Sequence, residues 1–419
     1  MTRHGLVFLG VFIVAAPAVA LAAPPVASEY LALPLASAQS AAVANSPDVA
    51  AAQARVRENQ HILAAARGAR APAATFNYAQ TPQAGPAGGS ITQRLFTLGG
   101  QIALGDYFTY APAVRQAEEN LIVAERDLQN AQRAERAKTD GLYFGALRSD
   151  AGVALREDSL RSAIADRAAA QKRFIAGAAP RLDVVRADLA VTRANADLDG
   201  ARVVRADAVQ ALAIESGLPP GAFFRIRTQN QQPLVPLDAS VAVRRAMALR
   251  SDVAAAEAAV RAEMAVVELS RRAILPAVTV NVGYTRGTDS GIAVHGPSAN
   301  LLVSLPISHA GADRIAAEQA RLDQSRARLA AVQRQVEIEV SSAARAYSAT
   351  MRAVQAAGRV REEAGAELRA VEIGYRNGAS SSLDVSDARR TYIAAQIDEL
   401  NAVYARAQAA ATLQELLGP

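Results

Sequence analysis

The stretch Tyr375–Ala388 reads Tyr-Arg-Asn-Gly-Ala-Ser-Ser-Ser-Leu-Asp-Val-Ser-Asp-Ala, and the alanine-rich sequence on both sides is typical of long helices. No proline interrupts residues 307–418. Asn377-Gly378 predicts the end of one helix, because glycine tolerates the left-handed conformation found after helix C-termini. Ser382 is the predicted N-cap of the next helix, since its hydroxyl can accept a hydrogen bond from a free backbone N–H. The stretch therefore predicts the turn of a helical hairpin.

Two carboxylates follow this turn at helical spacing. Asp384 and Asp387 are three residues apart, which places both on one face of the second helix. The N-terminal end of a helix dipole favours negative charge there. Acidic residues are common in first turns for this reason alone, so the pattern by itself leaves both a structural and a functional interpretation open.

The same layout occurs twice in the chain. Gly177 precedes a Leu-Asp-Val segment as Gly378 does, at an offset of 378 − 177 = 201. Further upstream, Asp48–Arg57 resembles Asp252–Arg261 at an offset of 252 − 48 = 204. Repeats of this length indicate an internal duplication. We expect repeat 1 at 23–220, a linker at 221–238 and repeat 2 at 239–419, with hairpin tips at 177–183 and 378–384.

Composition excludes several classes of protein. The 419 residues contain no cysteine, which excludes disulfides, thiolate metal sites, a cysteine nucleophile and a lipid-anchored cysteine. The 45 basic and 40 acidic residues are interspersed, which indicates a solvated surface and no nucleic-acid partner. The four histidines are scattered, and no catalytic triad, phosphate loop or metal-ligand cluster is found. We expect no enzyme activity, metal or cofactor.

The N-terminus resembles a targeting segment. Arg3 and His4 precede an apolar run that ends near Ala18, and small residues follow. This is the pattern of a secretory signal peptide, and the run is short for a membrane span. We expect residues 1–22 to be removed on export.

Two alternating segments predict β-hairpins, at about 73–108 and 277–306. In the first, Pro82–Gly89 has the composition of a loop. Ile91 and Leu95 occupy one side of the next strand, and Thr92, Arg94 and Phe96 the other, which predicts one apolar and one polar face. Residues 98–110 fit either strand or helix. In the second hairpin, Val278, Val280, Val282 and Tyr284 alternate with polar or small residues.

Helices surround both hairpins. Single helices are predicted at about 37–70 and 240–273, each ended by a proline. Long helices follow, one at about 112–176 and one that begins after Pro306 and ends at the second tip, with apolar residues every seven positions. A helix of such length reaches roughly 100 Å, which no compact domain contains. The last predicted helices are 183–216 and 383–417. Four strands cannot close a barrel alone, so a membrane location requires an oligomer.

The order of these elements resembles the TolC-type outer membrane efflux channel family. The motifs that carry the resemblance are Asn45-Ser-Pro-Asp48, the prolines before each hairpin, Leu305-Pro-Ile-Ser, and the two Gly-x4-Leu-Asp-Val tips. It covers nearly the whole mature chain. It implies a mainly α fold and a homotrimer whose twelve-stranded β-barrel spans the outer membrane, contacts its lipid and continues as a twelve-helix α-barrel across the periplasm. The partners it implies are a periplasmic adaptor (membrane fusion) protein and an inner-membrane pump, in efflux or type I secretion.

The resemblance also assigns tip residues. Asp384 and Asp387 occupy the positions of the family's two inward carboxylates, which would form charged rings in a trimer. Tyr375 and Asp183 occupy the positions of a tyrosine and its acidic partner in the closed state. Where the family's example channel has an arginine, this chain has Ser380, so no salt bridge is implied there. The tip residues expected to contact the adaptor are Gly177, Arg181, Leu182, Gly378, Ser380 and Leu383.

Two other functions were considered. A periplasmic adaptor carries one helical hairpin between the halves of a β-rich domain, whereas this chain carries the hairpin twice and lacks such flanks. A coiled-coil envelope scaffold without a pore would not need two amphipathic β-hairpins. The passive exit duct is therefore the favoured interpretation.

Overall fold

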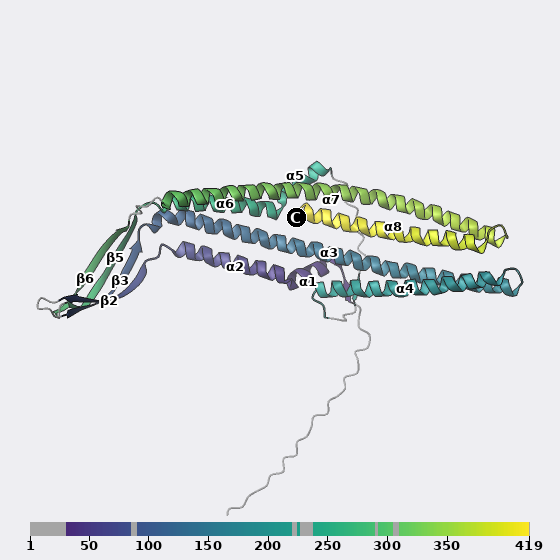
Figure 1. Cartoon of the computed structure of the whole chain (residues 1–419), viewed down its shortest axis with the longest axis horizontal. Helices are drawn as coiled ribbons and strands as arrows, with labels where there is room; N and C mark the ends of the chain where they lie inside the picture. The colour runs from purple at the N-terminus through teal and green to yellow at the C-terminus, as the bar shows by residue number, and fades with distance from the viewer. Residues whose placement is uncertain are drawn as a thin grey trace, which may run out of the picture.

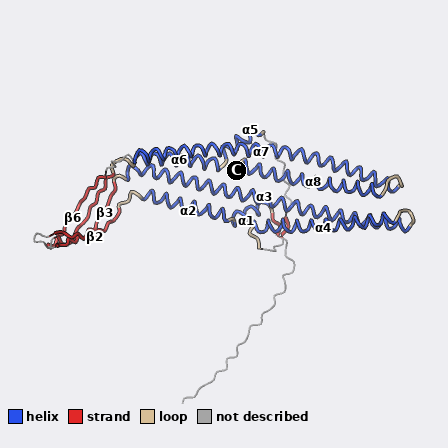
Figure 2. Tube along the Cα trace, in the orientation of Figure 1, coloured by secondary structure: helices blue, strands red, loops and turns tan. Residues whose placement is uncertain are grey.

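The computed structural model describes residues 31–84, 90–219, 224–226, 238–289, 292–304 and 310–418. The expected signal peptide at 1–22 lies outside these residues, as do most of the expected linker and the Leu305-Pro-Ile-Ser motif. The chain is elongated (Figure 1), with long helices side by side and a β-sheet at one end. The helical hairpin turns lie at the opposite end, as the colouring by secondary structure shows (Figure 2).

The two halves have the same order of elements. The first half contains β1 (Leu31–Leu33), α1 (Leu35–Asn45), α2 (Pro47–Gly68), β2 (Ala73–Ala84), β3 (Ser90–Ala103), α3 (Asp106–Ile175) and α4 (Arg181–Glu215). The second half contains β4 (Phe224–Ile226), α5 (Ala239–Leu249), α6 (Ser251–Arg272), β5 (Ala277–Asp289), β6 (Ile292–Ser304), α7 (Ala310–Arg376) and α8 (Ser382–Leu416).

Each predicted single helix before a β-hairpin is in fact two helices. The first break lies at Ser46, which is extended and whose hydroxyl accepts from the Val49 N–H, while Pro47 starts α2. The second lies at Arg250, at the offset 250 − 46 = 204. The Arg250 guanidinium donates to Asp252 and, at 3.1 Å, to Glu339 of α7. The second break is therefore stabilised by a contact with another helix. The alanine-rich pattern around Arg250 is continuous and gives no sign of it, so one helix was predicted.

The four long strands form one antiparallel sheet in the order β2-β3-β5-β6. The predicted loop from Pro82 was wrong for residues 82–84, which continue β2. Within the single chain β2 is an edge strand, a position in which proline is tolerated. Residues 98–110, which fitted either strand or helix, contain the end of β3 at Ala103 and the start of α3 at Asp106. α3 thus begins earlier than the predicted start near 112.

One face of the sheet is mainly apolar and the other is mainly polar or small. Pairing brings Phe76 opposite Leu98, and Leu98 opposite Tyr284, on the apolar face. The residues that share this face include Tyr78, Phe96, Ile102, Val278, Val280, Val282, Leu301 and Val303. Phe96 therefore lies on the apolar face and Leu95 on the polar one, so the assignment made for this strand from sequence was wrong. Phe76 is 70% and Leu98 67% exposed in the single chain.

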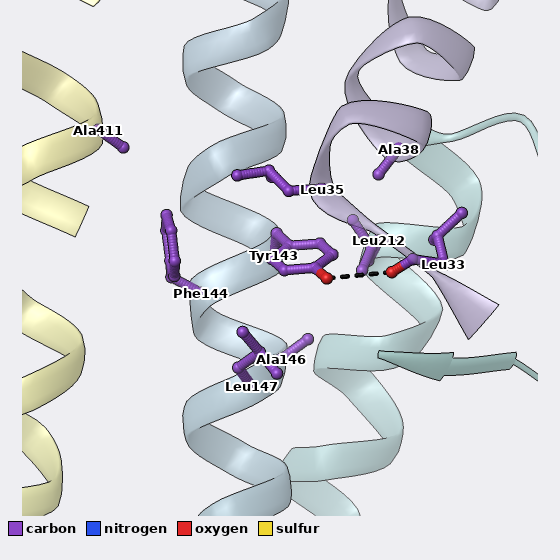
Figure 3. Packing of buried hydrophobic residues seen from close by; sticks show 9 residues of the cluster. All are labelled: Leu33, Leu35, Ala38, Tyr143, Phe144, Ala146, Leu147, Leu212 and Ala411. Carbon is purple, nitrogen blue, oxygen red and sulfur yellow. Dashed lines mark hydrogen bonds between the residues drawn. The ribbon is translucent and has the colours of Figure 1, made fainter. Parts of the chain in front are cut away.

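The buried core lies midway along the helices, where α1 and β1 contact α3 (Figure 3). Tyr143 is fully buried, and its hydroxyl donates to the Leu33 carbonyl at 3.0 Å. A second cluster surrounds Tyr347 of α7, at the offset 347 − 143 = 204, and includes residues of α5 and α8. β1 pairs in parallel with β4, which joins the two halves. Among the described helices, none has an apolar stretch long enough to cross a membrane.

Asp140 of α3 is a buried carboxyl beside this core. Gln39 of α1 donates to Asp140 Oδ1, and Glu415 of α8 lies near it. Burial raises the pKa of Asp140 from 3.8 to about 6. The native state therefore holds this proton more tightly than the unfolded chain does. The protonated Asp140 therefore contributes fully to the free energy of unfolding below about pH 4, and this contribution is lost as the pH rises through 6.

We predict that Asp140→Asn removes this pH dependence. The amide oxygen still accepts from Gln39, but it carries no charge above pH 6. The variant should be more stable than the parent at pH 7 by about 1–3 kcal/mol and similar to it at pH 4. Urea unfolding of the purified protein at both pH values measures the difference. A variant that is less stable at pH 7 contradicts the prediction.

Candidate functional site

The two hairpin tips have the same backbone conformation. Gly177 and Gly378 have φ of 72° and 78°, values that glycine adopts without strain. The Gly177 N–H donates to the Phe174 carbonyl at 3.0 Å, and the Gly378 N–H to the Tyr375 carbonyl at 3.3 Å. These bonds satisfy carbonyls at the ends of α3 and α7. Both glycines therefore stop a helix in the way the sequence predicted.

The N-cap of α8 is Ser381, one residue before the predicted Ser382. The Ser381 hydroxyl accepts from the Asp384 N–H, and the Asp384 carboxylate accepts from the Ser381 N–H at 2.7 Å. This reciprocal arrangement is a capping box. The backbone N–H of Ser381, then its hydroxyl, lower the pKa of Asp384, which keeps it ionised at neutral pH. Three consecutive serines made the capping position ambiguous in the sequence.

Ser382 instead contacts the first hairpin through Asp183. The Ser382 hydroxyl donates to Asp183 Oδ1 at 2.5 Å, and the Tyr375 hydroxyl lies 3.5 Å from Asp183 Oδ2. Asp183 belongs to α4 and its side chain is only 10% exposed. One carboxylate of the first hairpin thus receives hydrogen bonds from both helices of the second. The sequence singled out Tyr375 and Asp183, but it did not indicate the role of Ser382.

Tyr375 is also held by an arginine. The Arg173 guanidinium of α3 lies 4.2 Å from the centre of the Tyr375 ring, and it donates to the Tyr375 carbonyl at 3.3 Å. Such a cation–π contact adds to the hydrogen bond. Burial raises the pKa of Tyr375, and the Asp183 carboxylate adds to the shift against the opposing effect of Arg173. The phenol therefore keeps the proton that it donates to Asp183.

Arg389 of α8 makes the third contact between the hairpins, and sequence reasoning missed it. Its guanidinium pairs with Asp166 of α3 and with Glu372 of α7. The Arg389 side chain is 19% exposed, and burial lowers its pKa, although arginine remains charged at any physiological pH. The two carboxylates lie 372 − 166 = 206 positions apart, and no spacing rule joins residues so far apart. Only the packing of α3 against α8 brings them together.

A groove of about 700 Å³ separates the two hairpins near the tips. Its lining contains seven arginines, among them Arg173 and Arg389, but only four acidic residues, among them Asp166 and Asp183. Because a groove lies between the hairpins here, side-chain contacts rather than close packing hold the tips together. The contacts of Asp183, Arg173 and Arg389 are therefore the interactions that a separation of the hairpins must break.

The sequence matches a known family. The family model described as outer membrane efflux protein matches residues 38–217 and 242–419. The chain belongs to the outer membrane efflux protein family. No curated protein sequence matches it. The family description assigns this efflux protein to the outer membrane.

Solved structures share its fold at low sequence identity. CusC, studied for its folding and transmembrane channel formation, is 20% identical over 93% of each chain, with a TM-score of 0.80. The outer-membrane channel OprN is 20% identical over 92% of this chain and 89% of its own, with a TM-score of 0.79. VceC of Vibrio cholerae is 20% identical over 92% and 96%, with a TM-score of 0.78.

The remaining tip residues of the efflux protein lie at the surface. Arg181 and Leu182 start α4, and Leu383 lies in the first turn of α8; the two leucines are 54% and 46% exposed. Asp384 and Asp387 are exposed, and Asp387 pairs with Arg390 of its own helix. Neither contacts the first hairpin of the same chain. Among the described residues, no group of three or more potential ligands could hold a metal ion.

Two serine variants separate capping from contact between the hairpins. Ser381→Ala should increase hydrogen exchange at the Asp384 amide, because the loss of an N-cap costs about 1 kcal/mol of helix stability. Ser382→Ala should leave that amide protected and increase exchange around Asp183 instead. Hydrogen exchange read by mass spectrometry of tip peptides distinguishes them. Equal effects of both variants on the Asp384 amide would contradict the assignment of Ser381 as the cap.

Proposed function

We propose that three copies of this efflux protein form one closed duct through the outer membrane and the periplasm. The duct is shut at the helical tips at rest, and a periplasmic adaptor bound to an inner-membrane pump opens it. The observation that carries this proposal is the sheet. It has an exposed apolar face and two edge strands, β2 and β6, whose outer edges have no partner strand within the described residues.

The hydrocarbon of a membrane does not tolerate such edges. Unpaired N–H and C=O groups cost several kcal/mol each in lipid, so a sheet must close on itself there. About eight strands is the smallest number that closes. Three chains of four strands give 3 × 4 = 12, and β6 of each chain then pairs with β2 of the next. The apolar face meets lipid, and the face with Asn77, Thr97 and Asn281 lines a water-filled bore.

The helices support the same closure. Within the chain, α3 packs against both α4 and α8, and α8 packs against α7. This gives the lateral order α4-α3-α8-α7, which leaves α4 and α7 at the two sides. In a ring of three copies, α7 of one subunit packs against α4 of the next, which makes a wall of twelve helices. Alanine at many positions lets such helices approach closely.

Opening would take place at the tips. The Asp183, Arg173 and Arg389 contacts hold the two hairpins of a subunit together at the end that faces the inner membrane. An adaptor that binds the exposed turns at 177–182 and 378–383 more tightly in a dilated arrangement would shift the population toward that arrangement. Substrate then passes through the bore without chemical change, and the pump supplies the energy. Asp384 and Asp387 would stand near the narrow end, where charged side chains influence ion flow.

The internal repeat specifies how neighbouring sheets pair. The β2–β3 pair Ala73↔Gln101 corresponds to the β5–β6 pair Ala277↔Ser304, at offsets of 277 − 73 = 204 and 304 − 101 = 203. The junction of β3 with β5 is therefore the template for the junction of β6 with β2 of the next subunit.

We predict that Val303 lies opposite Tyr78 of the neighbouring subunit. Gly100 pairs with Val282 within the chain, and the offsets carry this pair to 100 + 203 = 303 and 282 − 204 = 78. The chain has no cysteine, so Val303→Cys with Tyr78→Cys can be tested without background. Oxidation in outer membranes should give covalent dimers and trimers on non-reducing gels. Val303→Cys with Ala79→Cys is the control, because Ala79 points to the other face and should not cross-link.

We predict that Arg389→Ala weakens the closed state. It leaves Asp166 and Glu372 without their shared cation, which should cost the closed state about 1–3 kcal/mol per subunit. Single-channel recordings in planar bilayers should show a larger fraction of time in conducting states. Arg326→Ala is the matched control, because Arg326 pairs with Asp323 on the same helix, away from the tips, and holds no second hairpin. Similar recordings for both variants would exclude Arg389 from gating.

A further inference from the structure

The similarity of the two tips extends to the helices that follow them. α4 and α8 are both 35 residues long and begin at an offset of 382 − 181 = 201. Their preceding glycines share one backbone conformation. If three copies form a ring, as proposed above, the junction between the two hairpins of one subunit has a counterpart between neighbouring subunits. The contacts of the first junction then indicate which residues meet at the second.

The offset of 201 relates each residue at the junction within the chain to a residue at the junction between subunits. At the junction within the chain, Asp183 accepts a hydrogen bond from the Ser382 hydroxyl, and Arg186 donates to Ser382 at 3.3 Å. At the junction between subunits, Asp384 takes the place of Asp183 (384 − 183 = 201). Asp387 takes the place of Arg186 (387 − 186 = 201), and Arg181 takes the place of Ser382. At the junction between subunits, the Arg181 guanidinium thus stands where the Ser382 hydroxyl stands within the chain. Its neighbours there are the carboxylates of Asp384 and Asp387.

We propose that Arg181 of each subunit forms a salt bridge with Asp384 and Asp387 of the adjacent subunit. Arg181 is exposed, and within the described residues it has no acidic partner in its own chain. Ser381 engages Oδ2 of Asp384, and the other oxygen belongs to an exposed side chain. The charge and position of Arg181 therefore complement those of Asp384 and Asp387. The site is incomplete in one chain, because its Arg181 comes from a second copy.

The other equivalent positions make this salt bridge the principal polar contact of the subunit junction. Tyr375 corresponds to Phe174 (375 − 174 = 201), which has no hydroxyl to donate. Arg389 corresponds to Asp188, which pairs with Arg167 of its own hairpin, and Asp166 corresponds to Glu367, so the subunit junction has no counterpart of the Arg389 ion pair. The contacts that hold hairpins together within a subunit are thus missing between subunits. The tips should separate first at the subunit junctions, when Arg181 leaves its two carboxylates.

Cysteine pairs in the full-length protein test this assignment. The variant R181C/D384C is oxidised in outer membranes, and D183C/S382C serves as the matched pair at the junction within the chain. The first should give covalent dimers and trimers on non-reducing gels. The second should form a disulfide within one chain, seen as protection from a maleimide without a change in subunit mass. R181C and D384C alone should remain monomeric on the same gels.

The outcomes separate this inference from the proposed duct. Native mass measurement reports the trimer independently of any cross-link. A trimer in which D183C/S382C cross-links but R181C/D384C does not would overturn the inference and leave the duct standing. A protein that is monomeric by native mass overturns both.

A charge reversal provides a second readout. R181E places a third carboxylate beside Asp384 and Asp387 of the partner subunit, which should raise the conducting fraction in planar bilayers about two- to fivefold. R181E/D387R restores opposite charges across the junction and should return the fraction toward that of the parent. An R181E channel that gates like the parent overturns the inference.

Discussion

The structure depends on one constraint: every backbone N–H and C=O in a membrane must have a partner. The sheet β2-β3-β5-β6 satisfies this requirement internally but leaves β2 and β6 with one open edge each. Its apolar face, with Phe76 and Leu98 largely exposed, is stable only against lipid. In the proposed duct, the sheet of one chain is a fragment of a barrel, and the helices that continue from its strands form a fragment of a wall. The oligomer of that proposal follows from hydrogen bonding rather than from an added interaction surface.

In the proposed trimer, the duplication makes the ring nearly symmetric. The two halves of the chain supply the same elements, so junctions within a subunit would resemble junctions between subunits. The resemblance ends at particular side chains. Within the chain, the side chains of Asp183, Tyr375 and Arg389 bind the two hairpins together across a polar groove. The equivalent residues at the proposed subunit junction are Asp384, Phe174 and Asp188. A ring with two kinds of junction can begin to open at one kind before the other.

Much of the site could be read from the sequence, but the errors are informative. The tip glycines were predictable because a left-handed C-terminus needs a residue without Cβ, and the Leu-Asp-Val repeat located Asp183 and Asp384. The N-cap was assigned to Ser382 but lies at Ser381, because three adjacent serines are equally able to cap. Arg389 was missed entirely, because its partners Asp166 and Glu372 lie on other helices. The break at Arg250 was missed for the same reason, since Glu339 stabilises it from α7.

The sequence by itself determined the local and periodic features: the duplication, the long helices, the alternating strands and the turns at Gly177 and Gly378. These features follow from backbone sterics and from the spacing of apolar residues, which act over a few positions of the chain. Only the tertiary structure decided which face of β3 is apolar, how β3 pairs with β5, and which charged groups meet between α3, α7 and α8. Those outcomes depend on the three-dimensional approach of segments up to about two hundred residues apart, which local rules do not encode.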